Sequence, residues 1–198
     1  MRVETYQSMP IRPEVRDVLI RIGAPRTQDA ALLAKAEQTV APLRPSGLLT
    51  LSPIVVKDKQ VDVQGRAMHS EKLARYLQGC SHALLMVSTL KQPVCDRIHQ
   101  LMENGQSDEA VWLDAAASVA ADTGLDFMIA AQQKRLEKQG MRTLCWRYSP
   151  GYGDLPLQTQ QILYDCLGAQ SLGIRLTPSY MLLPEKSVMA ICGVQTCR

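Results

Sequence analysis

The sequence predicts an α+β fold in which a twisted mixed or antiparallel sheet is flanked by helices, within a single domain over residues 1–198. Apolar residues recur every three to four positions in some segments and every two positions in others, so helices and strands are both expected. A hairpin and closely spaced terminal strands break any regular strand-helix alternation. This arrangement argues against a parallel βαβ sheet.

The N-terminal segment predicts one strand and two helices. Residues 3–6 predict a short strand. A helix follows from Pro13 with its apolar positions on one face, and Gly23 and Pro25 end it. A second helix over residues 27–43 ends at a Pro-Ser-Gly turn.

The middle of the chain predicts a hairpin, a buried strand and two further helices. Residues 48–63 alternate on either side of a polar turn, which predicts a hairpin. Ser70 can cap a short helix that Gly79 closes, and the apolar run at residues 83–87 predicts a buried strand. The next helix ends at an Asn-Gly pair at residues 104–105.

A long alanine-rich helix is expected from Asp108 to Gly140. Its small residues would let a neighbouring element approach closely, and Gly124 is expected to kink the helix or end it early. After Gly140 we expect a strand, a helix, a short strand and a terminal strand, at residues 143–146, 156–167, 173–176 and 188–194.

Composition and charge argue against several classes of protein. The net charge is +3 and no run of Lys or Arg forms a basic stripe, so nucleic-acid binding is not expected. No apolar run approaches the roughly 18 residues of a membrane span, and the charged N-terminus does not fit a signal peptide. We therefore expect no membrane contact and a cytoplasmic location.

The cysteines and histidines form no recognisable metal or catalytic motif. Six cysteines lie in apolar sequence without a Cys-x-x-Cys pair, so most are expected to be small buried residues. The close pair Cys192 and Cys197 has two interpretations, buried structural residues or a terminal metal or redox site. A hydrolase is not supported, because no motif surrounds the histidines, which are His69, His82 and His99.

One loop contains an unusual concentration of special residues, and two interpretations of it remain open. An ordinary turn is one of them, because Gly and Pro are common in loops. The other is a ligand site, in which Gly151 lets backbone approach a ligand, Arg147 binds a carboxylate or phosphate, and Tyr152 offers an aromatic face. The candidate residues are Arg147, Tyr148, Ser149, Pro150, Gly151 and Tyr152.

The Arg-x-x-x-Gly-Tyr motif of this loop belongs to a longer ordered set. A Pro-led helix follows it, and then come Gly173 to Ser179, Met181, Pro184, Ser187 and Val188. This set resembles the S-adenosylmethionine-binding activation domain of cobalamin-dependent methionine synthase, here as a free-standing short form. The resemblance is sharp over residues 143–194, within the motif-bearing region 108–198, and diffuse over residues 1–107.

The resemblance implies a shallow groove for S-adenosylmethionine beside a twisted antiparallel sheet. Arg147 would pair with the methionyl carboxylate, and Tyr152 would stand near the ligand or the corrin face. The backbone around residues 148–150 would line the ligand. The family also offers an acidic side chain from the upstream helix, for which Asp122 and Asp126 are candidates here, although a solvated helix face is the simpler interpretation of each.

The resemblance also implies cofactors and partners. In the family, reductive methylation restores an oxidised cobalamin with an electron from a donor such as a flavodoxin, so this protein would be at most one component of a methyltransferase. No Asp-x-His-x-x-Gly run is present, so cobalamin would arrive on a partner, a methionine synthase or another corrinoid protein. The full-length synthases add ligand contacts beyond the equivalent of Cys197, so we expect weak or lost affinity for S-adenosylmethionine here.

The sequence supports two other function classes to different degrees. A conventional methyltransferase is disfavoured, because no Gly-rich loop follows an early strand. The alternative that stays open is a non-catalytic docking or regulatory protein, which would bind a corrinoid methyltransferase without binding S-adenosylmethionine.

Overall fold

The computed structural model describes residues 2–197, and in this part of the chain seven strands form one curled sheet. The strand order is β4-β3-β2-β5-β9-β6, with β1 paired to β2, and every pairing is antiparallel. A separate two-stranded ribbon joins β7 and β8. The expected α+β class is therefore confirmed, and the sheet is antiparallel rather than mixed.

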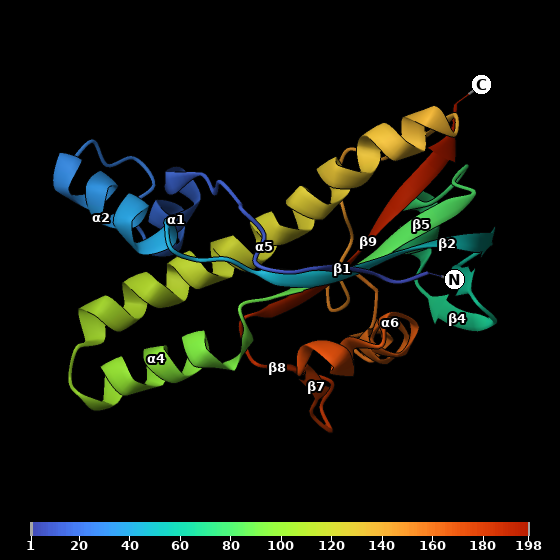
Figure 1. The fold of residues 1–198 in the computed structure, drawn as a ribbon. Coiled ribbons are helices and arrows are strands. Elements are labelled where there is room, and N and C mark those ends of the chain that lie inside the picture. The colour runs from blue at the N-terminus through green and yellow to red at the C-terminus, as the bar shows by residue number, and fades with distance from the viewer. Residues whose placement is uncertain (1, 198) are drawn as a thin grey trace.

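The strands and helices follow one another irregularly along the chain (Figure 1). The strands are β1 (Glu4–Tyr6), β2 (Ser46–Lys57), β3 (Gln60–Val63), β4 (Arg66–His69), β5 (His82–Thr89), β6 (Met141–Thr143), β7 (Arg175–Leu176), β8 (Leu182–Leu183) and β9 (Ser187–Thr196). The helices are α1 (Val15–Arg21), α2 (Ala30–Val40), α3 (Glu71–Tyr76), α4 (Lys91–Glu103), α5 (Ser107–Lys138), α6 (Thr159–Leu167) and the 3₁₀ turn η1 (Ala169–Leu172).

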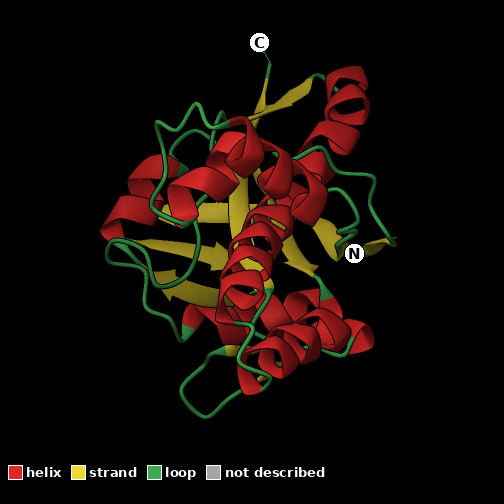
Figure 2. Cartoon of the chain, turned by 90° about the vertical axis from the view of Figure 1, so that its left-hand side faces the viewer, coloured by secondary structure: helices red, strands yellow, loops and turns green. Residues whose placement is uncertain are grey.

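Both faces of the central strands are buried. On β5, Leu84 and Met86 pack into a core with α1, α2, α4 and α5, whereas Leu85 and Val87 pack into a second core with α3, α6 and η1. Successive strand residues point to opposite faces, so a strand covered on both sides must be apolar throughout. Viewed from the end that carries α2 and α4, helices lie in front of the strands and cover them (Figure 2).

Helix α5 runs unbroken through Gly124, so the expectation that this glycine ends the helix early is wrong. Gly124 instead marks a close approach of α5 to the sheet. A Cβ there would overlap the Ser88 hydroxyl of β5 and lie 3.0 Å from Met9 Cε. The tertiary contact therefore outweighs the helix propensity that glycine lowers.

The expected elements differ from the structure in a few places. The sequence analysis missed β4 and β8, which are a short edge strand and a two-residue strand. The strand expected at 143–146 lies at Met141–Thr143, and the helix expected from Pro156 begins at Thr159 after a turn. Short strands contain too few residues for a period of two to be visible.

Across residues 2–197 the structure holds no helix with the length and apolar character that crossing a membrane would require.

Gly124→Ala tests the close packing of α5. We expect a net loss of about 1–3 kcal/mol of unfolding free energy from overpacking, despite the gain of roughly 1 kcal/mol in helix propensity. The measurement is urea unfolding followed by circular dichroism. Ser88→Ala in the same chain should restore most of the loss, because it removes the overlapping hydroxyl, which has no hydrogen-bond partner of its own. A Gly124→Ala variant as stable as the wild type would contradict this account.

Candidate functional site

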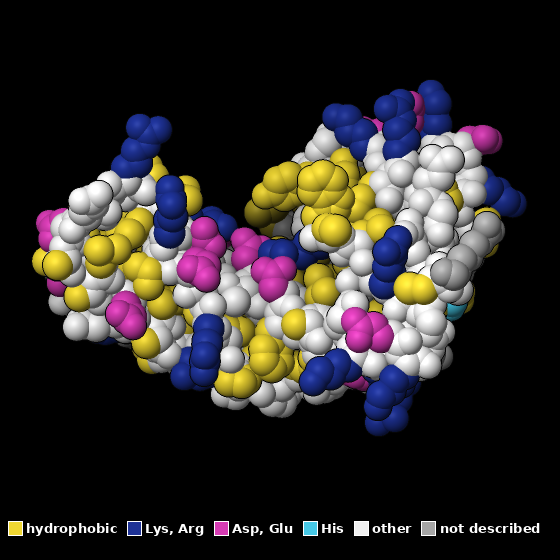
Figure 3. Space-filling view, turned by 90° about the horizontal axis from the view of Figure 1, so that it is seen from above, with side chains coloured by type: hydrophobic (Ala, Val, Ile, Leu, Met, Phe, Trp, Pro, Cys, Tyr) yellow, Lys and Arg dark blue, Asp and Glu magenta, His cyan; other side chains and the backbone are white. Residues whose placement is uncertain are grey.

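A groove of about 610 Å³ lies between α5, the start of β9 and the segment that follows β6. The space-filling view shows the molecule hollowed at one side, where charged side chains of both signs lie beside exposed hydrophobic ones (Figure 3). Ser118, Ala121 and Asp122 line the groove from one face of α5, at helical spacing. The other lining residues are Arg21, Cys145, Trp146, Arg147, Tyr148, Ser149, Tyr152, Glu185, Lys186, Ser187 and Val188.

A bulge at the sheet edge brings Arg147 into this groove. Thr143 pairs with Val194, and Tyr148 pairs next with Ile191. Between these two pairs the outer segment advances by five residues, whereas β9 advances by only three. The outer segment therefore contains two extra residues. Bulges of this kind bend an edge strand and re-aim its side chains, and they are frequent beside active sites. This bulge is why the strand expected to reach residue 146 stops at Thr143.

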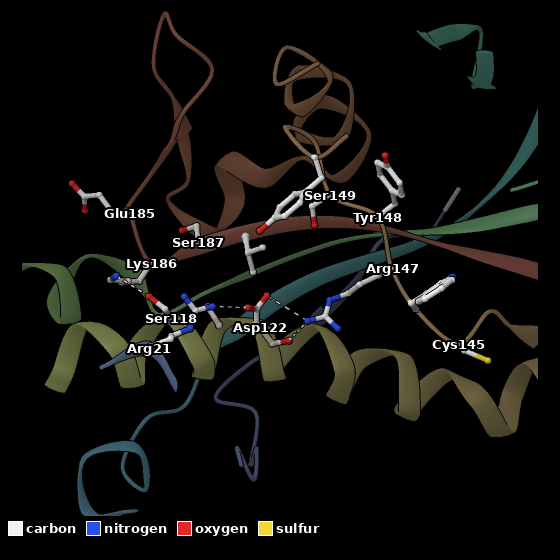
Figure 4. A pocket seen from close by; sticks show the side chains of 14 residues that line it. Arg21, Ser118, Asp122, Cys145, Arg147, Tyr148, Ser149, Glu185, Lys186 and Ser187 are labelled. Atoms are coloured by element: carbon white, nitrogen blue, oxygen red, sulfur yellow. Dashed lines mark hydrogen bonds and ion pairs between the residues drawn. The ribbon is translucent and has the colours of Figure 1, made fainter. Parts of the chain in front are cut away.

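Arg147 points from the bulge toward α5 and Asp122 (Figure 4), and it also contacts Asp126, the second predicted acidic candidate. Its Nη1 donates to Asp126 Oδ1, and its Nη2 lies 3.4 Å from Asp122 Oδ1 and 3.3 Å from the Asp122 carbonyl oxygen. The Arg147 side chain is 24% exposed. The structure thus brings Arg147 into contact with Asp122 and Asp126, a contact that the sequence did not predict.

Asp122 and Asp126 occupy different positions around Arg147. Asp122 lines the groove, and its second oxygen accepts from Arg21 Nη2 at 3.1 Å, so this carboxylate lies between two arginines. Asp126 lines only a neighbouring pocket of about 340 Å³, which Asp122 and Arg147 line as well. Desolvation raises the pKa of Asp126, while the charge of Arg147 opposes this rise.

The loop after Arg147 is anchored to α3 by Asp154. Its carboxylate accepts from the Ser70 hydroxyl and from the backbone N–H groups of Glu71 at 2.9 Å and Lys72 at 3.2 Å. Ser70 in turn accepts from Leu73 N–H at 2.9 Å, which confirms it as the N-cap. The Ser70 hydrogen bond is the main cause of the lowered pKa of Asp154.

Aromatic residues around the groove differ in their exposure. Trp146 is 74% exposed and Tyr152 is 71% exposed, so both offer ring surface to a ligand or a partner. The ring of Tyr148 instead turns away from Arg147 and lies 6.0 Å from the ring of Tyr76, centroid to centroid (Figure 4). Of the predicted loop, four residues line the groove, and these are Arg147, Tyr148, Ser149 and Tyr152.

Gly151 and Pro150 shape the loop. Gly151 has a positive φ of 89°, a conformation that favours glycine, and its N–H donates to the Leu155 carbonyl at 2.9 Å. Pro150 is buried. These two predicted site residues therefore contribute to the turn, and Ser149 accepts the closing hydrogen bond from Tyr152 N–H at 3.2 Å.

Several groove residues carry no signal in the sequence. Arg21 reaches Asp122 across 101 residues of chain, and no local pattern marks such a contact. Lys186 is 13% exposed and lies 2.7 Å from Asp114 Oδ1 and 2.9 Å from the Ser118 hydroxyl. A signal was present for the bulge, since a glycine inside a strand, here Gly193, often marks one.

The cysteines are all unpaired among the described residues. Cys95 and Cys192 are buried, Cys80 and Cys166 are partly buried, and Cys145 and Cys197 are exposed, so the expectation of burial holds for only some of them. The described chain contains no cluster of three or more His, Cys, Asp or Glu residues suited to a metal ion.

Of the comparisons with known proteins, the one with solved structures bears on the fold. Neither a protein-family model nor the sequence of a curated protein matches this chain. A similar solved structure is the crystal structure of the MetH reactivation domain bound to AdoHcy, with a TM-score of 0.69 and 12% identity. The match covers 98% of this chain and 78% of that one. The chain therefore has the fold of that reactivation domain.

Asp154→Asn tests the anchor of the groove loop. The pKa of Asp154 is lower in the folded state than the value of about 3.9 expected in the unfolded state. Its contribution to the free energy of unfolding is therefore fully present above the unfolded pKa and is lost as the pH falls through the folded pKa. Thermal unfolding of the wild type should therefore show a loss of stability at acidic pH that the variant largely lacks. Asp58→Asn, in the exposed hairpin turn, is the matched control and should keep the wild-type profile.

Proposed function

We propose that this protein binds S-adenosylmethionine in the groove beside Arg147 and serves as a reactivation module for the cobalamin of a separate methionine synthase or related corrinoid protein. The observation that carries the proposal is the opposed pair Arg147 and Asp122 in one groove, within the fold of a domain whose crystal structure holds AdoHcy. The volume of about 610 Å³ is within the usual range for small-molecule sites.

The charges of the groove complement an amino acid. A methionyl group carries a carboxylate and an ammonium on one carbon, and it needs a cation and an anion placed side by side. Arg147 supplies a planar fork for the carboxylate, and Asp122 supplies a carboxylate for the ammonium. Arg147 holds five donors, so a ligand carboxylate can bind while part of the contact with Asp126 remains.

The exposed aromatic rings suit the rest of the ligand. An adenine ring stacks on aromatic faces, and a sulfonium is attracted to them as other cations are. Trp146 and Tyr152 both line the groove and are largely exposed. When bound, S-adenosylmethionine supplies the methyl group, and the residues of this chain would orient it toward a corrinoid on the partner, with an electron from a donor such as a flavodoxin.

A second candidate function is non-catalytic docking on a corrinoid methyltransferase. The observation that favours it is the same exposed pair, Trp146 and Tyr152, because aromatic residues are enriched in protein interfaces. In that case the wild type would not bind S-adenosylmethionine, and a corrinoid protein would still bind this surface.

Arg147→Ala tests the proposed function. In calorimetric titrations, S-adenosylmethionine should bind the wild type, and the variant should lose about tenfold to a hundredfold in affinity because a charge-assisted hydrogen bond is lost. Arg142→Ala, on the exposed outer side of β6, is the matched control and should bind as the wild type does. No binding by the wild type would sink the proposal and leave docking as the better account.

Asp122→Asn and Asp126→Asn separate the two acidic candidates. Asp122 lines both the groove and the neighbouring pocket, whereas Asp126 lines only the neighbouring pocket, so only the first change removes a counter-charge from the ligand ammonium in the groove. We expect Asp122→Asn to weaken binding by roughly tenfold and Asp126→Asn to weaken it less. The reverse order would place the amino group of the ligand beside Asp126 instead.

A further inference from the structure

Tyr76 of α3 reaches the backbone on both sides of Arg147. Its hydroxyl donates to the carbonyl oxygen of Trp146, and its ring packs against the ring of Tyr148 at a tilt of 35°. The same hydroxyl accepts from Gly193 N–H of β9 at 3.4 Å. One side chain from another element therefore contacts the residues directly before and after Arg147 and the strand opposite.

The thiol of Cys192 supports the same segment from β9. Its Sγ lies 3.5 Å from the Trp146 carbonyl oxygen and 3.7 Å from that of Leu144, so the bulge carbonyls that no strand partner satisfies have donors. Burial raises the pKa of Cys192 to about 11, which keeps the thiol protonated at neutral pH. A protonated thiol is a weak donor, so Tyr76 provides the stronger hydrogen bond of the two.

Gly193 makes this arrangement possible. A Cβ at this position would lie 2.6 Å from Leu144 Cδ1 and 2.7 Å from Cys80 Sγ, distances that real side chains do not tolerate. The outer segment therefore packs directly on the glycine backbone, where its N–H is within reach of the Tyr76 hydroxyl.

Without a fixed bulge, the outer segment has another way to pair. Continued in the register of β6, Trp146 would stand opposite Ile191, the place that Tyr148 occupies in the structure. That slip would carry Arg147 past Ile191 along β9 and away from its present position over Asp122. Edge segments whose register is weakly specified are prone to such slips.

We propose that Tyr76 is a positioning residue of the groove, which fixes the two-residue bulge so that Arg147 meets α5 and Trp146 faces the groove, with Cys192 as its weaker partner. The effect on ligand affinity rests on the proposed function. The effect on the bulge does not, and it can be measured without any ligand.

The test compares Tyr76→Phe with Tyr164→Phe. Tyr164 also donates its hydroxyl to a backbone carbonyl, that of Ile174 at 3.1 Å, but at α6 rather than at the bulge. Both changes are made in a Trp112→Phe chain, so that Trp146 is the remaining tryptophan of two. The readouts are the fluorescence anisotropy of Trp146 and the dissociation constant for S-adenosylmethionine.

We expect Tyr76→Phe to lower the anisotropy of Trp146 and to weaken binding about threefold to tenfold, the range of one net hydrogen bond. Tyr164→Phe should change neither quantity. Cys192→Ala should lower the anisotropy and the affinity as Tyr76→Phe does, but by less. It replaces Tyr76→Phe as the test variant if Tyr76→Phe does not unfold cooperatively. An unchanged Trp146 signal in both bulge variants would overturn the proposal, whereas loss of binding in every chain with the anisotropy change intact would overturn the proposed function alone.

Discussion

The bulge between β6 and β9 is the constraint on which the groove depends. In a regular antiparallel edge, Arg147 would continue along β9. The two extra residues instead turn it toward α5, where it meets Asp122 and Asp126. The backbone carbonyls that the bulge leaves without strand partners accept hydrogen bonds from the side chains of Tyr76 and Cys192. The cost of irregular backbone is thereby kept small at the point where a charged side chain has to be aimed.

The close approach of α5 to the sheet is the second requirement. Gly124 and the alanines before it bring the helix near enough for its side chains to form one wall of the groove, opposite the start of β9. Arg21 then reaches Asp122 from α1, which ties the helical layer to the same charge cluster. The groove is therefore assembled from segments that are distant in sequence, and no single motif contains it.

Much of the fold could be predicted from periodicity alone. The long helix, the hairpin at β2 and β3 and the buried strands β5 and β9 all have enough residues to show their period. The strands β4 and β8 are too short to show a period of two. The bulge at residues 144–147 interrupts the alternation that would mark the strand continuing from β6.

The site was predictable in part. The dense loop pointed to Arg147, and the family resemblance pointed to Asp122 and Asp126, which the structure brings into contact with it. Arg21 and Tyr76 act through contacts that only tertiary structure creates, so sequence patterns could not identify them. Pro150 and Gly151 stand out in the sequence because they shape the turn. A Pro-Gly pair looks the same in a sequence whether it only forms a turn or also contacts a ligand.

The most direct measurement is a titration of isotopically labelled protein with S-adenosylmethionine, followed through its backbone amide resonances. The account predicts saturable shifts concentrated at the residues that line the groove, which include Ser118, Ala121, Asp122, residues 145–149, Tyr152 and residues 185–188. Shifts concentrated instead around Gly79 and residues 195–197, at the pocket near the C-terminal end of β9, or no saturable shifts at all, would contradict it.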